Sequence, residues 1–192
     1  MKIESLSRLR DAQQFSAASK YWNQSQLLRA FKLFLALARR GHASSQLAVG
    51  YFFDLGLGVR KSEAQALFWY RRSYRNGHAS GASNIGTIYR DRGNIKRALE
   101  WFSRALKAGD DSSALEIAKI YVNVGDYLRA IKNVRLVVAS DRVTEAETEE
   151  ATTLLKKVLA EHKKSDKAGA SRSKSRSHRS IRQTRKQKVR AG

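Results

Sequence analysis

Three groups of residues have types and spacings that could support chemistry. The stretch GLGVRKS at 56–62 resembles the end of a phosphate-binding loop, but Arg60 stands where the pattern GxxxxGK[ST] needs glycine. His42 and His78 each follow a glycine without further ligands at helical spacing, so they indicate helix-end hydrogen bonds rather than a metal site. The glutamates at 145–150 suit the acidic first turn of a helix better than a catalytic pair. We therefore predict a non-enzymatic protein without metal or cofactor.

A basic C-terminal segment, residues 163–192, carries the strongest remaining signal. It holds twelve Lys and Arg and one acid, and the whole chain has a net charge of +21. Neutralisation of nucleic-acid phosphates is one interpretation, and a solubilising tail or attraction to a membrane surface are alternatives. No aromatics interleave with the charges, so base-specific recognition is not expected. The candidate polyanion-binding residues are Lys163, Lys164, Lys167, Arg172, Lys174, Arg176, Arg179, Arg182, Arg185, Lys186, Lys188 and Arg190.

The composition of the 192 residues favours a helical body. The chain has no proline, which would break helix interiors, and 42% of its residues are hydrophobic. It has no cysteine, so a disulfide framework and a cysteine metal site are excluded. No apolar run has the length of a signal peptide or a transmembrane helix. We expect a cytoplasmic protein.

A pattern that recurs four times sets the architecture. The units are 11–42, 43–78, 79–110 and 111–142, and each has a small residue at position 8 and an aromatic at position 11. Apolar residues at helical spacing on both sides of a turn predict two helices in each unit. A glycine such as Gly86 costs about 1 kcal/mol inside a helix, so we expect a close helix crossing there, with the small Ala98 and Ala105 opposite.

The ends of the chain differ from the repeats. Residues 1–10 form a lead-in, and 143–162 form a helix that caps the open end of the stack. Ser62 with Gln65, and Thr144 with Glu147, predict capping boxes. The segment 163–192 is too polar to bury a core and is predicted to be disordered. We therefore predict an all-α solenoid of about four antiparallel helix pairs, with a capping helix and a disordered basic tail.

The second unit contains Leu47-Ala48-Val49-Gly50, Phe53, Gly56-x-Gly58-Val59, Ala64-x-Ala66, Trp69-Tyr70 and Gly77-His78-Ala79. With these residues it resembles a Sel1-like repeat. The third and fourth units have shorter turns and resemble tetratricopeptide repeats, and the first unit matches more weakly. The resemblance covers 11–142. It implies a right-handed solenoid with a concave face lined by the first helix of each unit, and an adaptor that holds peptides or proteins.

The resemblance also implies the groove positions. Chaperone-binding members clamp a peptide carboxylate with Lys and Asn, but here Ser, Tyr and Thr stand at the corresponding places. Trp69, Tyr70 and Trp101 lie on second helices and are expected in the core, whereas Trp22 could be a core residue or a partner contact. The groove candidates are Trp22, Tyr51, Asp54, Thr87, Arg90 and Lys119.

These observations favour an adaptor whose groove holds a protein or peptide and whose tail contacts a polyanion. The alternative is a nucleic-acid- or ribosome-associated protein that binds mainly through the tail and uses the helical body as a support. The salt dependence of partner binding distinguishes the two.

Overall fold

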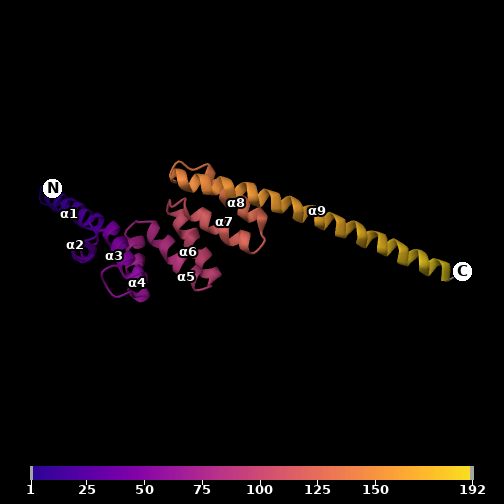
Figure 1. Cartoon of the computed structure of the whole chain (residues 1–192), viewed down its shortest axis with the longest axis horizontal. Helices are drawn as coiled ribbons and strands as arrows, with labels where there is room; N and C mark the ends of the chain where they lie inside the picture. The colour runs from indigo at the N-terminus through magenta and orange to yellow at the C-terminus, as the bar shows by residue number, and fades with distance from the viewer. Residues whose placement is uncertain (1, 191–192) are drawn as a thin grey trace. The chain divides into compact units, whose positions relative to one another are not determined.

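The computed structural model describes residues 2–190, and it describes side chains within residues 6–167. Residues 2–190 form nine helices and no strand, which confirms the all-α repeat prediction (Figure 1). The helices are α1 (Lys2–Asn23), α2 (Leu27–Arg39), α3 (Ala43–Leu55), α4 (Glu63–Arg75), α5 (Ser80–Asp91), α6 (Ile95–Lys107), α7 (Ser113–Asn123), α8 (Tyr127–Val138) and α9 (Glu145–Arg190).

The chain divides into two compact units, and the boundary between Ile117 and Ala118 falls inside α7. In the first unit, α1 packs on α2, α3 on α4 and α5 on α6, and contacts of α2 with α3 and of α4 with α5 join the pairs. In the second unit, α8 packs on α9. Each predicted repeat contains two helices, although α1 begins before the first repeat, and α9 follows the fourth.

The same hydrogen-bonded cap ends the second helix of three repeats. After α4, the N–H of His78 donates to the carbonyl of Ser73 at 3.0 Å, and Gly77 lies between them with a φ of 90°. The N–H groups of His42 and Asp110 make the corresponding bonds to Leu37 and Ala105. Glycine adopts this left-handed conformation without a Cβ penalty. The cap therefore fixes where these three repeats end.

The paired helices cross closely at the small residue of position 8, as predicted. A Cβ built on Gly86 would lie 2.7 Å from Cδ1 of Phe102, and one on Gly50 would lie 2.5 Å from the Tyr70 ring. The opposing group is thus an aromatic ring on the second helix, where the sequence pointed to small alanines. Glycine is needed because the ring occupies the space that a side chain would take.

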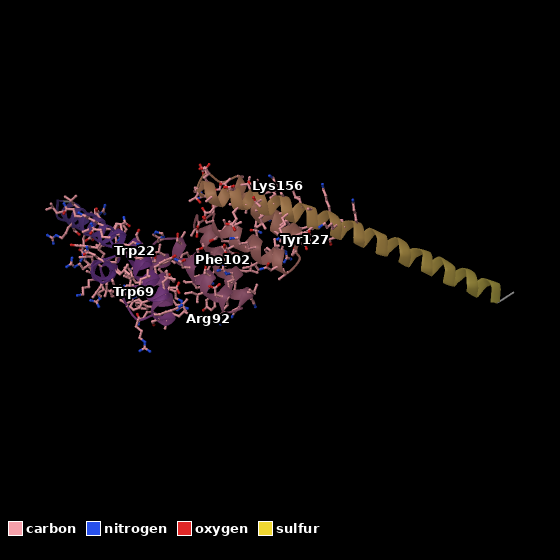
Figure 2. The ribbon with its side chains drawn as sticks, viewed as in Figure 1. Trp22, Trp69, Arg92, Phe102, Tyr127 and Lys156 are labelled. Atoms are coloured by element: carbon pink, nitrogen blue, oxygen red, sulfur yellow. The ribbon has the colours of Figure 1, made fainter. Side chains whose placement is uncertain are left out.

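Aromatic residues dominate the core of the first unit. Phe34, Phe52 and Trp69 pack together with small alanines, and Tyr70 and Phe102 are completely buried (Figure 2 labels Trp69 and Phe102). The core position predicted for Trp69 and Tyr70 is confirmed, whereas Trp101, for which the same was predicted, is only half-buried. The second unit has a smaller core, in which Ala130, Ile131 and Val158 are covered by residues that include Tyr121, Tyr127 and Leu154.

Helices α1 and α9 differ from the sequence prediction. Helix α1 begins at Lys2, so the lead-in is helical. Helix α9 continues to Arg190 through the segment for which disorder was predicted, while residues 191–192 lie outside the described residues. Lys, Arg, Gln and Ala favour helices, and no proline interrupts the segment, so local propensity permits the extension without a core. Within residues 2–190, no helix combines the length and apolar character that a membrane span requires.

Candidate functional site

The first groove candidates meet where α1 ends beside α3. The ring centroids of Trp22 and Tyr51 are 6.4 Å apart, and Trp22 also stands edge-on to Phe52 at 4.7 Å. Trp22 is half-buried against the aromatic core, whereas 41% of Tyr51 is exposed. Trp22 therefore supports the surface, and Tyr51 is the more accessible ring.

Asp54 lies one turn after Tyr51 in α3 and contacts the scaffold. Its carboxylate accepts a hydrogen bond from the Tyr70 hydroxyl at 3.1 Å. Burial, followed by the negative charge and hydrogen bond of Asp54, raises the pKa of Tyr70 far above its ordinary value of 10.0. Asp54 thus satisfies the polar end of a buried tyrosine.

Thr87 and Arg90 lie one turn apart on α5. Arg90 forms ion pairs with Asp91, at 3.0 Å, and with Glu116 of α7. A charge reversal at Arg90 would therefore place three negative groups together and perturb the fold as well as any ligand. Thr87 is half-buried. It carries no charge, so a substitution there tests the groove without disturbing the ion pairs of Arg90.

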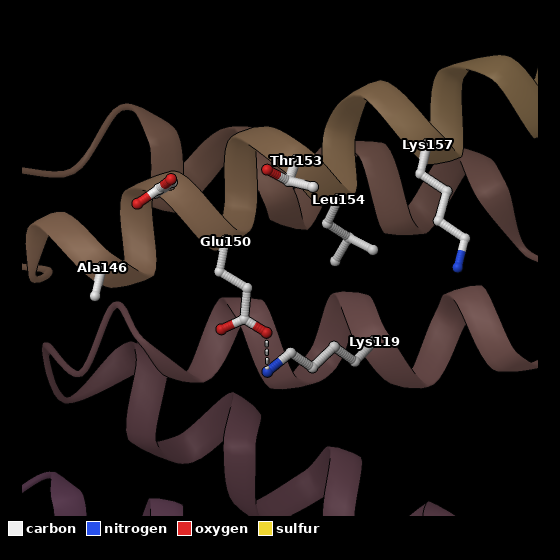
Figure 3. A pocket seen from close by; sticks show the side chains of 7 residues that line it. Lys119, Ala146, Glu150, Thr153, Leu154 and Lys157 are labelled. Atoms are coloured by element: carbon white, nitrogen blue, oxygen red, sulfur yellow. Dashed lines mark ion pairs between the residues drawn. The ribbon is translucent and has the colours of Figure 1, made fainter.

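Lys119 belongs to the second unit and lines a pocket between α7 and α9 (Figure 3). Its Nζ lies 2.8 Å from Oε1 of Glu150. The pocket has a volume of about 560 Å³, and its α9 residues recur every three or four positions, a helical stripe that we did not identify from the sequence. Its lining residues are Lys119, Ala146, Glu149, Glu150, Thr153, Leu154 and Lys157.

The tail candidates all lie on α9. Lys163, Lys164 and Lys167 are exposed, and Lys164 Nζ pairs with Glu161 at 2.8 Å. The remaining candidates lie on the helical backbone, but their side chains are outside the part that the structure describes. They are Arg172, Lys174, Arg176, Arg179, Arg182, Arg185, Lys186, Lys188 and Arg190.

The motifs that suggested chemistry have structural roles. Residues 56–62 connect α3 to α4, and the Ser62 hydroxyl accepts a hydrogen bond from the Gln65 N–H at 3.4 Å. The His42 ring accepts one from the Ser45 N–H at 3.2 Å and caps α3, as its helix-end position predicted. The described residues contain no group of three or more His, Cys, Asp or Glu side chains that could hold a metal ion.

Solved structures of repeat proteins share this fold. The structure of c5321, a protective antigen of uropathogenic Escherichia coli with an SLR fold, has a TM-score of 0.59 and 24% identity over 66% of this chain. This alignment spans 30% of c5321, so this chain matches under a third of that protein's length. A Sel1 repeat protein from Oxalobacter formigenes has a TM-score of 0.58 and 18% identity, covering 77% of this chain and 73% of that one.

A third structure, of MamA, has a TM-score of 0.50 and 14% identity and covers 78% of this chain and 96% of that one. Identities this low show the fold alone. The Sel1 repeat family model matches residues 43–78 and 85–110. This chain contains Sel1-like helical repeats. Sel1 repeats generally form scaffolds for protein–protein interaction and are typically non-enzymatic. No curated protein matches the sequence of this chain.

Proposed function

We propose that this Sel1-like protein is a non-enzymatic adaptor that binds a peptide or protein segment along its first helices. The observation that carries the proposal is Tyr51, which is 41% exposed and is held against the half-buried Trp22. A tyrosine fixed in this way offers apolar area and a hydroxyl at low entropic cost, which is the typical composition of a binding hot spot. The proposed surface includes Thr87 on the next first helix, α5.

Peptide selection on the full-length protein tests this proposal. A displayed random peptide library is selected on the immobilised chain, and calorimetry then measures the affinity of the selected peptide. Tyr51→Ala is expected to weaken that affinity by about ten-fold or more, because hot-spot truncations cost about 2 kcal/mol. The control is Leu128→Ala, which truncates a side chain that is 67% exposed in the second unit. Equal affinities of the two variants would refute the groove.

We also propose that the basic segment 163–192 contacts a polyanion. Its twelve cations would displace counterions from nucleic-acid phosphates, so binding should weaken steeply as salt rises. The test replaces the Lys and Arg residues of this segment by Gln and measures the affinity for a single-stranded oligonucleotide at several salt concentrations. A control that exchanges Lys and Arg within the segment keeps the charge. Unchanged binding after neutralisation would refute a role for the tail.

The second candidate function is a nucleic-acid- or ribosome-associated protein in which the repeats only support the tail. The net charge of +21 favours this candidate. The two functions differ in salt response, because a groove-held peptide should remain bound at moderate salt and a tail-held nucleic acid should dissociate. Capture of a peptide that survives moderate salt supports the adaptor.

A further inference from the structure

One face of α4 combines arginines with an exposed aromatic ring. Phe68, Arg71, Arg72 and Arg75 follow the spacing i, i+3, i+4 and i+7, which places them on a single stripe. Phe68 is 47% exposed, Arg72 and Arg75 are exposed, and Arg71 is half-buried. The Arg72 guanidinium lies 5.6 Å from the centroid of the Phe68 ring. The stripe therefore offers charge and a flat apolar surface together.

Helix α6 continues this surface with the same spacing. The stripe consists of Glu100, Ser103, Arg104 and Lys107, and Glu100, Arg104 and Lys107 are exposed. The half-buried Trp101 joins the two helices, because its ring centroid lies 6.0 Å from that of Tyr74 on α4. The Arg104 guanidinium lies 4.6 Å from the Trp101 centroid. We call the combined set the α4–α6 surface; its residues are Phe68, Arg71, Arg72, Tyr74, Arg75, Glu100, Trp101, Ser103, Arg104 and Lys107.

The charges of the α4–α6 surface are available to a ligand. Its five cations face one carboxylate, Glu100. Among the side chains that the structure describes, none of these cations forms an ion pair, in contrast to Arg90 and Lys119. The negative helix C-termini favour cations in the last turns of α4 and α6, but they do not require them on one face, and Arg71 lies before the last turn. Helix capping alone therefore does not account for the surface.

We propose that the α4–α6 surface binds single-stranded nucleic acid, with its arginines contacting phosphates and with the exposed ring of Phe68 stacking against a base. Arginine presents a planar fork of donors that matches phosphate oxygens. Aromatic side chains beside a positive surface are the usual platform for unpaired bases, and charge-matched probes without bases distinguish this ligand from an acidic chain. This site lies on the folded repeats and rests on neither the groove nor the tail.

Charge reversal in the full chain tests the phosphate contacts. The probe is a fluorescein-labelled 20-mer of uridine, and its affinity is measured by anisotropy across a salt series. Arg75→Glu with Lys107→Glu is expected to weaken binding about ten-fold at 0.15 M salt and to reduce the slope of log K against log salt by about 1.4, or 0.7 for each lost contact. The control with the same charge change is Arg60→Glu with Lys61→Glu, in the exposed turn before α4. Equal losses in the two variants would overturn the proposal.

Stacking is tested at Phe68 and with probes that lack bases. Phe68→Leu is expected to weaken uridine binding about five-fold, the equivalent of about 1 kcal/mol for one stacked base, while Phe68→Tyr keeps the ring and should bind as the wild type does. An abasic 20-mer and polyglutamate should bind more weakly than the uridine 20-mer, and Phe68→Leu should not change their affinities. If either charge-matched probe binds as tightly as uridine, the surface recognises acidic chains and the proposal fails. Thermal unfolding confirms that each variant is folded.

The proposals for the tail and for the α4–α6 surface can be refuted separately. In a full chain whose tail cations are replaced by Gln, residual uridine binding should still respond to Arg75→Glu with Lys107→Glu. If tail neutralisation removes all binding and the α4–α6 variant has no effect in the unmodified chain, the tail proposal stands and this one is overturned.

Discussion

Replacing Gly86 with alanine should destabilise the first unit, although alanine is the better helix former by about 1 kcal/mol. The new Cβ would lie 2.7 Å from Cδ1 and 2.8 Å from Cε1 of Phe102, against an ordinary carbon–carbon contact of about 3.5–4.0 Å. Phe102 is completely buried, so its ring cannot move into solvent. Overpacking of a core costs about 1–3 kcal/mol, and we expect a net loss of about 1 kcal/mol.

A double-mutant cycle with Phe102→Leu isolates this contact. Leucine lacks Cε1, and its two Cδ atoms can rotate away from the new Cβ, unlike the rigid ring. Gly86→Ala in the Phe102→Leu background should therefore become neutral or stabilise the fold by up to about 1 kcal/mol. The expected coupling is about 1–2 kcal/mol, measured by urea unfolding monitored by circular dichroism. Gly93→Ala is the control, because its φ is 74° and no atom lies within 4 Å, so its cost should not depend on Phe102. An effect of Gly86→Ala that is the same in both backgrounds would refute the close crossing.

Three further predictions concern a cap, a buried hydroxyl and an ion pair. Thr144 and Glu147 form the reciprocal capping box at the start of α9, so Thr144→Ala should lower the free energy of unfolding by about 1 kcal/mol in thermal or urea unfolding. Thr144→Ser keeps the capping hydroxyl and should retain most of the stability of the wild type. The raised pKa of Tyr70 contributes stability that is complete below pH 10 and decreases as the pH rises above it. Tyr70→Phe cannot ionise, so its free energy of unfolding should fall less steeply above pH 10 than that of the wild type. At pH 7 the same substitution should lower the free energy of unfolding by about 1 kcal/mol, because a hydrogen bond is lost. Glu150→Gln removes the ion pair with Lys119 and should lower the free energy of unfolding by less than about 1 kcal/mol. This loss of stability should diminish at 1 M salt, and a loss that does not depend on salt would mean that the ion pair is not its cause.

Local sequence signals predicted the repeat elements well, because each signal depends on residues a few positions apart. Ser62 and Thr144 cap helices where their spacing to Gln65 and Glu147 indicated. The small residue at Gly86 predicted a close crossing, since a helical glycine needs compensation. The opposing residue was not predictable in this way, because it lies on a different helix and depends on how the two helices are rotated about their axes.

The availability of charged side chains was decided by the tertiary structure. Arg90 and Lys119 read as free groove cations in the sequence, but carboxylates on other helices, Glu116 and Glu150, lie against them in the fold. The arginines of α4 and α6 were not singled out in the sequence, and the contact between Tyr74 and Trp101 brings the two helices together.

The sequence by itself determined the period of the repeats, the positions of the helices and the sign of the charge, because these follow from local propensity, capping and composition. The tertiary structure decided which rings are covered and which cations are paired. Both outcomes depend on distances between residues about 30 positions apart, and only the stacking of one helix pair on the next sets those distances.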